Sequence, residues 1–280
     1  MPDIDAAVIT ERVKKACIEA CCVLGDDVMA ALQRSREIEE SPAAKDVIDQ
    51  LIENAEIASE EQVPICQDTG LALVFVELGE EAHIIRGGLY DAINEGVRQG
   101  YEEGYLRKSV VRHPIDRINT TDNTPAVIHV ELVPGDRVKI TVAPKGGGSE
   151  NMSAAKMLTP ADGLEGVKSF VVETVVDAGS NPCPPIIVGV GIGGTLEKAA
   201  LLSKKAILRK VGEPSRNPLD AQIERDLLAA VNDTGVGPSG LGGRVTALAV
   251  HVESYPCHIA SLPVAITLQC HAARHVAFEV

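Results

Sequence analysis

The sequence predicts an α/β protein: mixed sheets flanked by helices, with a helical N-terminal region. Residues 10–59 place apolar side chains at the three- and four-residue spacing of helices. Beyond residue 63, short β-branched runs alternate with helical stretches. No internal repeat or linker interrupts the 280 residues. We therefore expect a single domain over residues 1–280, with a helical lobe at 1–62 and an α/β part at 63–280 that carries the functional site.

In the N-terminal lobe, Val13, Ala16, Cys17 and Ala20 share one helical face, so this face is expected in the core. Ser41-Pro42 is typical of a helix start, because Ser caps the first turn and Pro fits within it.

The α/β part is punctuated by Gly and Pro. Pro134-Gly-Asp136 predicts a turn that joins two strands. Strands are expected at 71–78, 126–133, 137–143, 185–189, 247–253 and 263–268, and helices at 88–103, 163–178, 196–208 and 220–232.

Composition excludes some functions. Hydrophobic residues make up 45% of the chain, but aromatic residues only 2%, and the net charge is −14. Nucleic-acid binding is not expected, because it needs basic surfaces and stacking aromatic rings. No stretch is apolar enough to span a membrane. The acidic N-terminus does not resemble a signal peptide, so a cytoplasmic location is expected, with reduced cysteines.

Three of the seven cysteines stand at junctions between predicted elements. Cys66 lies between the helical lobe and a strand, Cys183 lies among three prolines, and Cys270 follows the last strand. Such junctions can meet at one end of a sheet. Their wide spacing fits no zinc finger, whereas three thiolates suit an iron–sulfur cluster that leaves one iron open. A buried structural role for each cysteine remains the alternative.

The other cysteines are expected to be structural. Cys17 and Cys21 share a helical face among alanines, and Cys22 follows directly, which favours core packing. Cys257 adjoins His258, but neighbouring side chains in an extended chain point in opposite directions.

Two glycine-rich turns could bind anions. Lys145-Gly-Gly-Gly-Ser149 follows a strand but is not a P-loop, because its Lys precedes the glycines. Gly189-Val-Gly-Ile-Gly-Gly194 matches the dinucleotide pattern between a strand and a helix. A nicotinamide-dependent oxidoreductase is therefore an alternative hypothesis, although no clear acidic residue follows at the required distance. The start of the helix could instead receive a carboxylate.

Five motifs together resemble the catalytic domain of iron–sulfur (class I) fumarate hydratases and the similar L-tartrate dehydratase alpha subunits. These motifs, in the order of the family, are Pro64-Ile-Cys-Gln-Asp-Thr-Gly70, Pro144-Lys-Gly-Gly-Gly-Ser-Glu-Asn151, Gly189-Val-Gly-Ile-Gly-Gly-Thr195, Gly235-Val-Gly-Pro-Ser-Gly-Leu-Gly-Gly243 and Gln269-Cys-His-Ala-Ala-Arg274. The resemblance implies a [4Fe–4S] cluster held by Cys66, Cys183 and Cys270, with substrate on the open iron.

The resemblance also implies roles for single residues. Gln67, Arg107 and Gly148 match positions that bind substrate. Asp68 matches a substrate contact and candidate general acid, and His258 matches an active-site histidine. The implied reaction is the reversible hydration of fumarate to (S)-malate, with dehydration of tartrate to oxaloacetate as the alternative. A non-enzymatic redox sensor is a third hypothesis, which the acidic net charge does not favour.

Single-chain members of this family carry a second domain that supplies further active-site residues. Here the sequence ends at Val280, soon after Cys270. We therefore expect a catalytically incomplete alpha subunit that works with a separate beta subunit, and a dimer of alpha chains. The sequence does not separate fumarate from tartrate as substrate.

Overall fold

The computed structural model describes residues 3–280, and the expected α/β class with mixed sheets and a helical N-terminal region is confirmed. These residues form two compact units. Unit 1 comprises the chain up to Leu24, Ala55–Gly147 and Arg274–Val280, and unit 2 comprises Gly25–Asn54 and Gly148–Ala273. The N-terminal helices are thus shared between the units.

The expected helical block consists of α1 (Ala6–Cys22), α2 (Asp26–Ile38) and α3 (Pro42–Glu61). The Asp5 side chain caps α1 by accepting a hydrogen bond from the Ala7 N–H. The start at Pro42 is confirmed. The helical block is divided into three helices, because the chain is extended at Val23 and again at Glu39.

Unit 1 contains a four-stranded sheet. Its order is β10 (Val276–Glu279), β5 (Val138–Lys145), β2 (Leu71–Gly79) and β4 (Val127–Val133). The turn at Pro134–Asp136 does join two strands, but β4 and β5 are not neighbours. Strand β2 lies between them, parallel to β4 and antiparallel to β5. A further pair, β1 (Asp3–Asp5) and β3 (His83–Ile85), is parallel.

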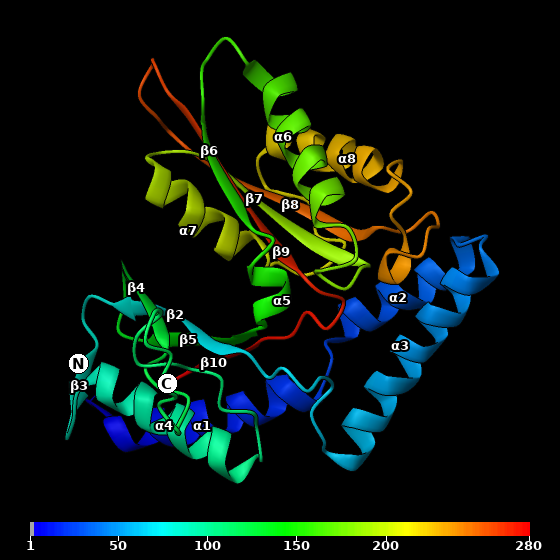
Figure 1. Ribbon diagram of the computed structural model, residues 1–280. Helices are drawn as coiled ribbons and strands as arrows, with labels where there is room; N and C mark the ends of the chain where they lie inside the picture. The colour runs from blue at the N-terminus through cyan, green and yellow to red at the C-terminus, as the bar shows by residue number, and fades with distance from the viewer. Residues whose placement is uncertain (1–2) are drawn as a thin grey trace. The chain divides into compact units, whose positions relative to one another are not determined.

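The core of unit 1 lies between its sheet and the helices α1 and α4 (Leu89–Glu103) (Figure 1). The predicted α1 face is buried. The two helices approach closely because α4 presents glycines at i and i+4. A Cβ on Gly96 would lie 2.6 Å from the Thr10 carbonyl oxygen, and one on Gly100 would lie 2.9 Å from the Cys17 Cβ.

Unit 2 contains the second four-stranded sheet. Its order is β6 (Ala154–Leu158), β9 (Leu262–Gln269), β7 (Ile186–Gly193) and β8 (Ala247–Tyr255). Helix α7 (Leu196–Ala206) covers one face, and α6 (Gly163–Ala178) and α8 (Pro218–Asn232) cover the other (Figure 1). The short elements are α5 (Gly147–Glu150) and the 3₁₀ turn η1 (Pro238–Gly240).

Side chains alternate along β7. Ile186, Val188 and Val190 enter the core beneath α6 and α8. On the opposite face, a Cβ on Gly189 would lie 2.2 Å from the Ser203 carbonyl oxygen, and one on Gly191 would lie 2.0 Å from that of Ala199, both in α7. The strand expected at 185–189 thus continues to Gly193, so the expectation of a glycine turn is wrong for Gly191. Both glycines lie inside the strand and let α7 pack against it.

No helix among residues 3–280 is both long enough and apolar enough to cross a membrane.

Candidate active site

The first part of the candidate site is the loop between α3 and β2 in unit 1. The Ile65 N–H donates to the Cys21 carbonyl at 2.9 Å and ties the loop to α1. Cys66 follows and is half-buried. Its Sγ accepts a hydrogen bond from the Asp68 N–H at 3.4 Å and lies 3.3 Å from Oε1 of Gln67. Gln67 is exposed and Asp68 half-buried, so this loop presents a thiol, an amide and a carboxyl group that solutes can reach.

Backbone groups orient the Asp68 carboxyl group. Its Oδ1 accepts from the Gly70 N–H at 3.0 Å, and its Oδ2 accepts from the Gly147 N–H at 2.8 Å. Gly70 has φ +72°, and a Cβ there would lie 2.6 Å from the Lys145 backbone. The Gly70 position therefore requires glycine. Two motifs that are far apart in the sequence meet here, since the Lys145 glycine segment closes onto the Cys66 loop.

Two buried polar side chains, whose role was not predicted from the sequence, donate hydrogen bonds to the backbone of this loop. The Tyr101 hydroxyl donates to the carbonyls of Thr69 at 2.8 Å and Gly70 at 3.1 Å. Asn123 Nδ2 also donates to the Gly70 carbonyl, and the Thr69 hydroxyl donates to the Arg107 carbonyl. The segment that carries Arg107 is therefore anchored beside the Cys66 loop, with the Arg107 side chain exposed.

In unit 2, Cys183 and Cys270 lie at the same end of the sheet. Cys183 precedes β7 and Cys270 follows β9, and these strands pair antiparallel, with Ile187 opposite Gln269. The Cys183 carbonyl accepts from the His271 N–H at 3.4 Å, and Nδ1 of His271 lies 3.1 Å from it. Exposed Gly148 is close by, since a Cβ on it would lie 3.4 Å from the Asn181 carbonyl oxygen.

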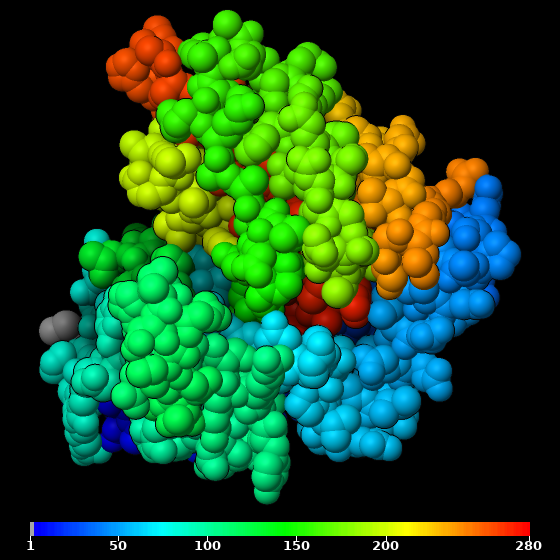
Figure 2. Space-filling model, viewed as in Figure 1, coloured from blue at the N-terminus to red at the C-terminus, as the bar shows by residue number. Residues whose placement is uncertain are grey.

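His258 lies at the opposite end of this sheet. It belongs to the connection between β8 and β9, the orange loop that protrudes in Figures 1 and 2. The eight residues of β9 separate this turn from Cys270. At about 3.3 Å per residue, that separation is about 26 Å. Within unit 2 the structure therefore does not bring His258 to the cysteine end.

His258 lines an open pocket of about 730 Å³. It is lined by Tyr255, Cys257 and Lys198, and by Gly194 and Thr195 at the start of α7. The Nδ1 atom of His258 accepts from the Ala260 N–H at 3.1 Å. Nε2 is then the nitrogen that faces other partners. Two sequence motifs, the glycines after β7 and the Cys257-His258 pair, thus share one pocket at this end of the sheet.

The seven cysteines differ in burial, and the core packing predicted for Cys17 and Cys21 is confirmed. Cys17, Cys21 and Cys22 are buried, whereas Cys66 and Cys270 are half-buried and Cys183 is exposed. Cys257 is exposed, not packed in the core, and its Sγ lies 3.3 Å from the Ser261 carbonyl oxygen. Burial raises the pKa of Cys21 to about 12, which keeps this thiol protonated.

One buried cation beside the Cys66 loop offers hydrogen-bond donors that suit an anionic group. Arg274 is only 5% exposed, and its Nε and Nη1 have no hydrogen-bond partner. Buried orphan donors are rare in proteins and suit a bound anion. Within residues 3–280 no three His, Cys, Asp or Glu side chains form a compact metal site. Cys66 lies in unit 1, and Cys183 and Cys270 lie in unit 2.

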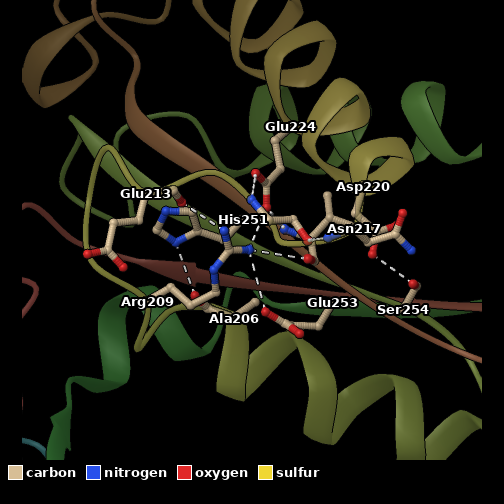
Figure 3. A network of polar contacts seen from close by, with 11 residues as sticks. Ala206, Arg209, Glu213, Asn217, Asp220, Glu224, His251, Glu253 and Ser254 are labelled. Carbon is tan, nitrogen blue, oxygen red and sulfur yellow. Dashed lines mark hydrogen bonds and ion pairs between the residues drawn. The ribbon is translucent and has the colours of Figure 1, made fainter.

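A second polar cluster in unit 2 was not predicted (Figure 3). Arg209 Nη1 pairs with Oε1 of Glu224 at 2.5 Å and contacts Glu253 at 3.4 Å. The Glu224 carboxylate also accepts from the N–H groups of Ser215 and Val252. It thereby fastens the loop before α8 to strand β8. Because the Glu224 carboxylate oxygens accept hydrogen bonds from groups of unit 2 itself, we assign this cluster to stabilising the fold.

Comparisons with known proteins agree with the resemblance. The family described as fumarate hydratase (Fumerase) matches residues 10–279. A Methanocaldococcus jannaschii protein, provisionally named L(+)-tartrate dehydratase subunit alpha, is 47% identical over 91% of this chain and 92% of its own length. The L(+)-tartrate dehydratase subunit alpha of Escherichia coli K12 is 35% identical over 89% of this chain and 83% of its own. The chain therefore belongs to the fumarate hydratase (Fumerase) family of hydro-lyases.

Proposed function

We propose that this chain is the alpha subunit of an iron–sulfur hydro-lyase that interconverts fumarate and (S)-malate. The observation that carries the proposal is the Cys66 loop, which presents an accessible thiol, amide and carboxyl group and is held by backbone N–H groups and the buried Tyr101 hydroxyl. The family match supports a hydration reaction. Dehydration of L-tartrate to oxaloacetate is the second candidate, because two relatives are named for it.

Cys66, Cys183 and Cys270 would hold a [4Fe–4S] cluster. Their accessibility supports them over buried Cys17, Cys21 and Cys22, and their places in the motifs support them over Cys257, which is also exposed. When bound, the cluster supplies a Lewis-acidic iron at the oxygen that leaves the substrate.

The chain's own residues bind and orient the substrate. Arg107 and Gln67 would bind a carboxylate, and Gly148 would contribute a backbone contact. In the dehydration direction the C2–O bond breaks, and Asp68 donates a proton so that the hydroxyl leaves as water. Asp68 is suited to this role because backbone amides at Gly70 and Gly147 fix its orientation.

A beta subunit would supply the base that removes the C3 proton. The relatives' names, which call them subunit alpha, support such a partner. We further propose a dimer of alpha chains in which His258 serves the site of the second copy. This arrangement is consistent with the strand length that separates His258 from Cys270 in its own unit.

Anaerobic reconstitution of the full chain, alone and with a beta partner, tests the proposal. Iron and sulfide content and the hydration of fumarate are measured, with L-tartrate as the second substrate. We expect cluster uptake and activity that requires the partner. Cys66→Ser should lose the cluster, whereas the control Cys257→Ser, at an accessible cysteine outside the three, should retain it. A wild-type chain without iron, or full activity from the alpha chain alone, would contradict the proposal.

Mixing two inactive variants tests the role of His258. Asp68→Asn and His258→Asn chains are refolded together with the beta partner. If His258 acts across the dimer, one site of each mixed dimer is intact, so roughly a quarter of wild-type activity should return. If it acts within its own chain, no site is intact and the mixture stays inactive.

A further inference from the structure

Arg274 is a buried cation without a counter-charge. The side chain is only 5% exposed, and within residues 3–280 no carboxylate lies within ion-pair distance of it. It makes one hydrogen bond, from Nη2 to the Asp68 carbonyl at 2.8 Å, and leaves Nε and Nη1 unused. Burying an unpaired charge destabilises a protein, so its presence needs an explanation beyond folding.

The hydrogen bond of Arg274 links it to Cys66 through Asp68. The Asp68 residue that accepts it through its carbonyl also donates its N–H to Cys66 Sγ. Arg274 therefore holds the carbonyl of the residue whose N–H group binds the Cys66 thiol. The positive charge also reaches the thiols of α1, since it opposes the effect of burial on the pKa of Cys21 and of Cys22.

We propose that Arg274 is the positioning residue that retains the cluster at Cys66, through its charge and its two unused donors. This proposal rests on the proposed function. A cluster with thiolate ligands is anionic, and hydrogen bonds and nearby charge tune how strongly such a group is held. The protein thus keeps a site that is destabilised when empty and is neutralised when the cluster binds.

Two properties of Arg274→Met are measured on the full chain: the unfolding temperature of the cluster-free protein, and the rate at which a chelator removes iron after anaerobic reconstitution. The matched control is Arg12→Met, in the same unit, whose exposed guanidinium lies 4.8 Å from the Phe278 ring centre. Arg274→Lys keeps the charge but not the fork of donors.

We expect cluster-free Arg274→Met to unfold at or above the temperature of the control, because an unpaired buried charge is removed. Iron should leave it about 10- to 100-fold faster than wild type, as for other partners of metal ligands. Arg274→Lys should lie between the two. Iron release from Arg274→Met at the wild-type rate would overturn the proposal. If the KM for substrate also rose, the Nε and Nη1 donors would be assigned to substrate binding instead.

An unfolding temperature of Arg274→Met below that of the control would also overturn the proposal, because Arg274 would then serve folding. Cluster uptake by the wild-type chain is measured first. If wild type takes up no cluster, the proposed function fails, and this result is distinct from any difference between the variants.

Discussion

Glu39 allows a sharp test of how unit 2 is stabilised. Its carboxylate is 1% exposed and accepts four backbone N–H groups. Oε1 accepts from Glu40 at 2.8 Å and Ser41 at 3.1 Å, and Oε2 accepts from Arg244 at 2.7 Å and Val245 at 3.1 Å. One side chain thus joins the end of α2 to the segment before β8.

The substitution Glu39→Gln keeps one oxygen and replaces the other with an NH₂ group. Two backbone donors then lose their acceptor, at about 1–3 kcal/mol each. We expect a loss of about 4 kcal/mol in the free energy of unfolding. At about 2–4 °C per kcal/mol for large domains, the midpoint should fall by roughly 10 °C.

The pH dependence has a defined sign. Burial opposes ionisation of Glu39, but the four backbone amides outweigh it and lower its pKa below the ordinary 4.5. Because the folded pKa is lower than the unfolded one, this stability is present above about pH 4.5 and is lost as the pH falls through the folded value. The difference between wild type and Glu39→Gln should therefore be constant near neutral pH and shrink in acid.

Circular dichroism during heating and in urea, from pH 4 to 8, measures both effects. Glu40→Gln is the matched control, because the ion pair of Glu40 with Arg244 is exposed and contributes about 0–1 kcal/mol. A Glu39→Gln protein that unfolds like this control at pH 7 would refute the reasoning.

Three further predictions follow from the packing and burial described above. Gly191→Ala should lower the free energy of unfolding by at least about 1–3 kcal/mol, measured in urea, because its Cβ would overlap the Ala199 carbonyl; unchanged stability would contradict the packing role of this glycine. Iodoacetamide at pH 8 should label Cys183 but not Cys21, as read by mass spectrometry of the native protein, and equal labelling would contradict the burial that raises the Cys21 pKa. Burial, aided by the Arg209 charge, lowers the pKa of His251 from 6.5, so its contribution to stability is lost as the pH falls below that value; His251→Gln should show a smaller decrease in urea stability from pH 7 to 5, and an equal decrease would disprove the assignment.

The sequence located local structure well. The helices expected at 88–103 and 163–178 agree with α4 and α6 within a residue, because their apolar periodicity and glycine boundaries are local signals. The same approach separated Cys17 and Cys21, now found buried, from the accessible junction cysteines. The roles of Cys66, Cys183 and Cys270 in holding a cluster stay predictions.

Local signals failed where a contact joins distant segments. The GxGxxG pattern looked like a turn, but Gly191 lies in a strand because α7 packs over it. Strand β2 enters between two strands that a short turn connects. Asn123 and Tyr101 carried no pattern that linked them to the Cys66 loop.

By itself, the sequence determined the fold class, most elements and the family, because periodicity, turn residues and ordered motifs are properties of short segments. Tertiary structure alone decided which distant groups meet. It brought the Gly147 N–H to the Asp68 carboxylate, buried Arg274 with no carboxylate at ion-pair distance among residues 3–280, and set His258 and Cys270 at opposite ends of β9. Such outcomes depend on strand order and on hydrogen bonds between segments up to 206 residues apart, which no local pattern encodes.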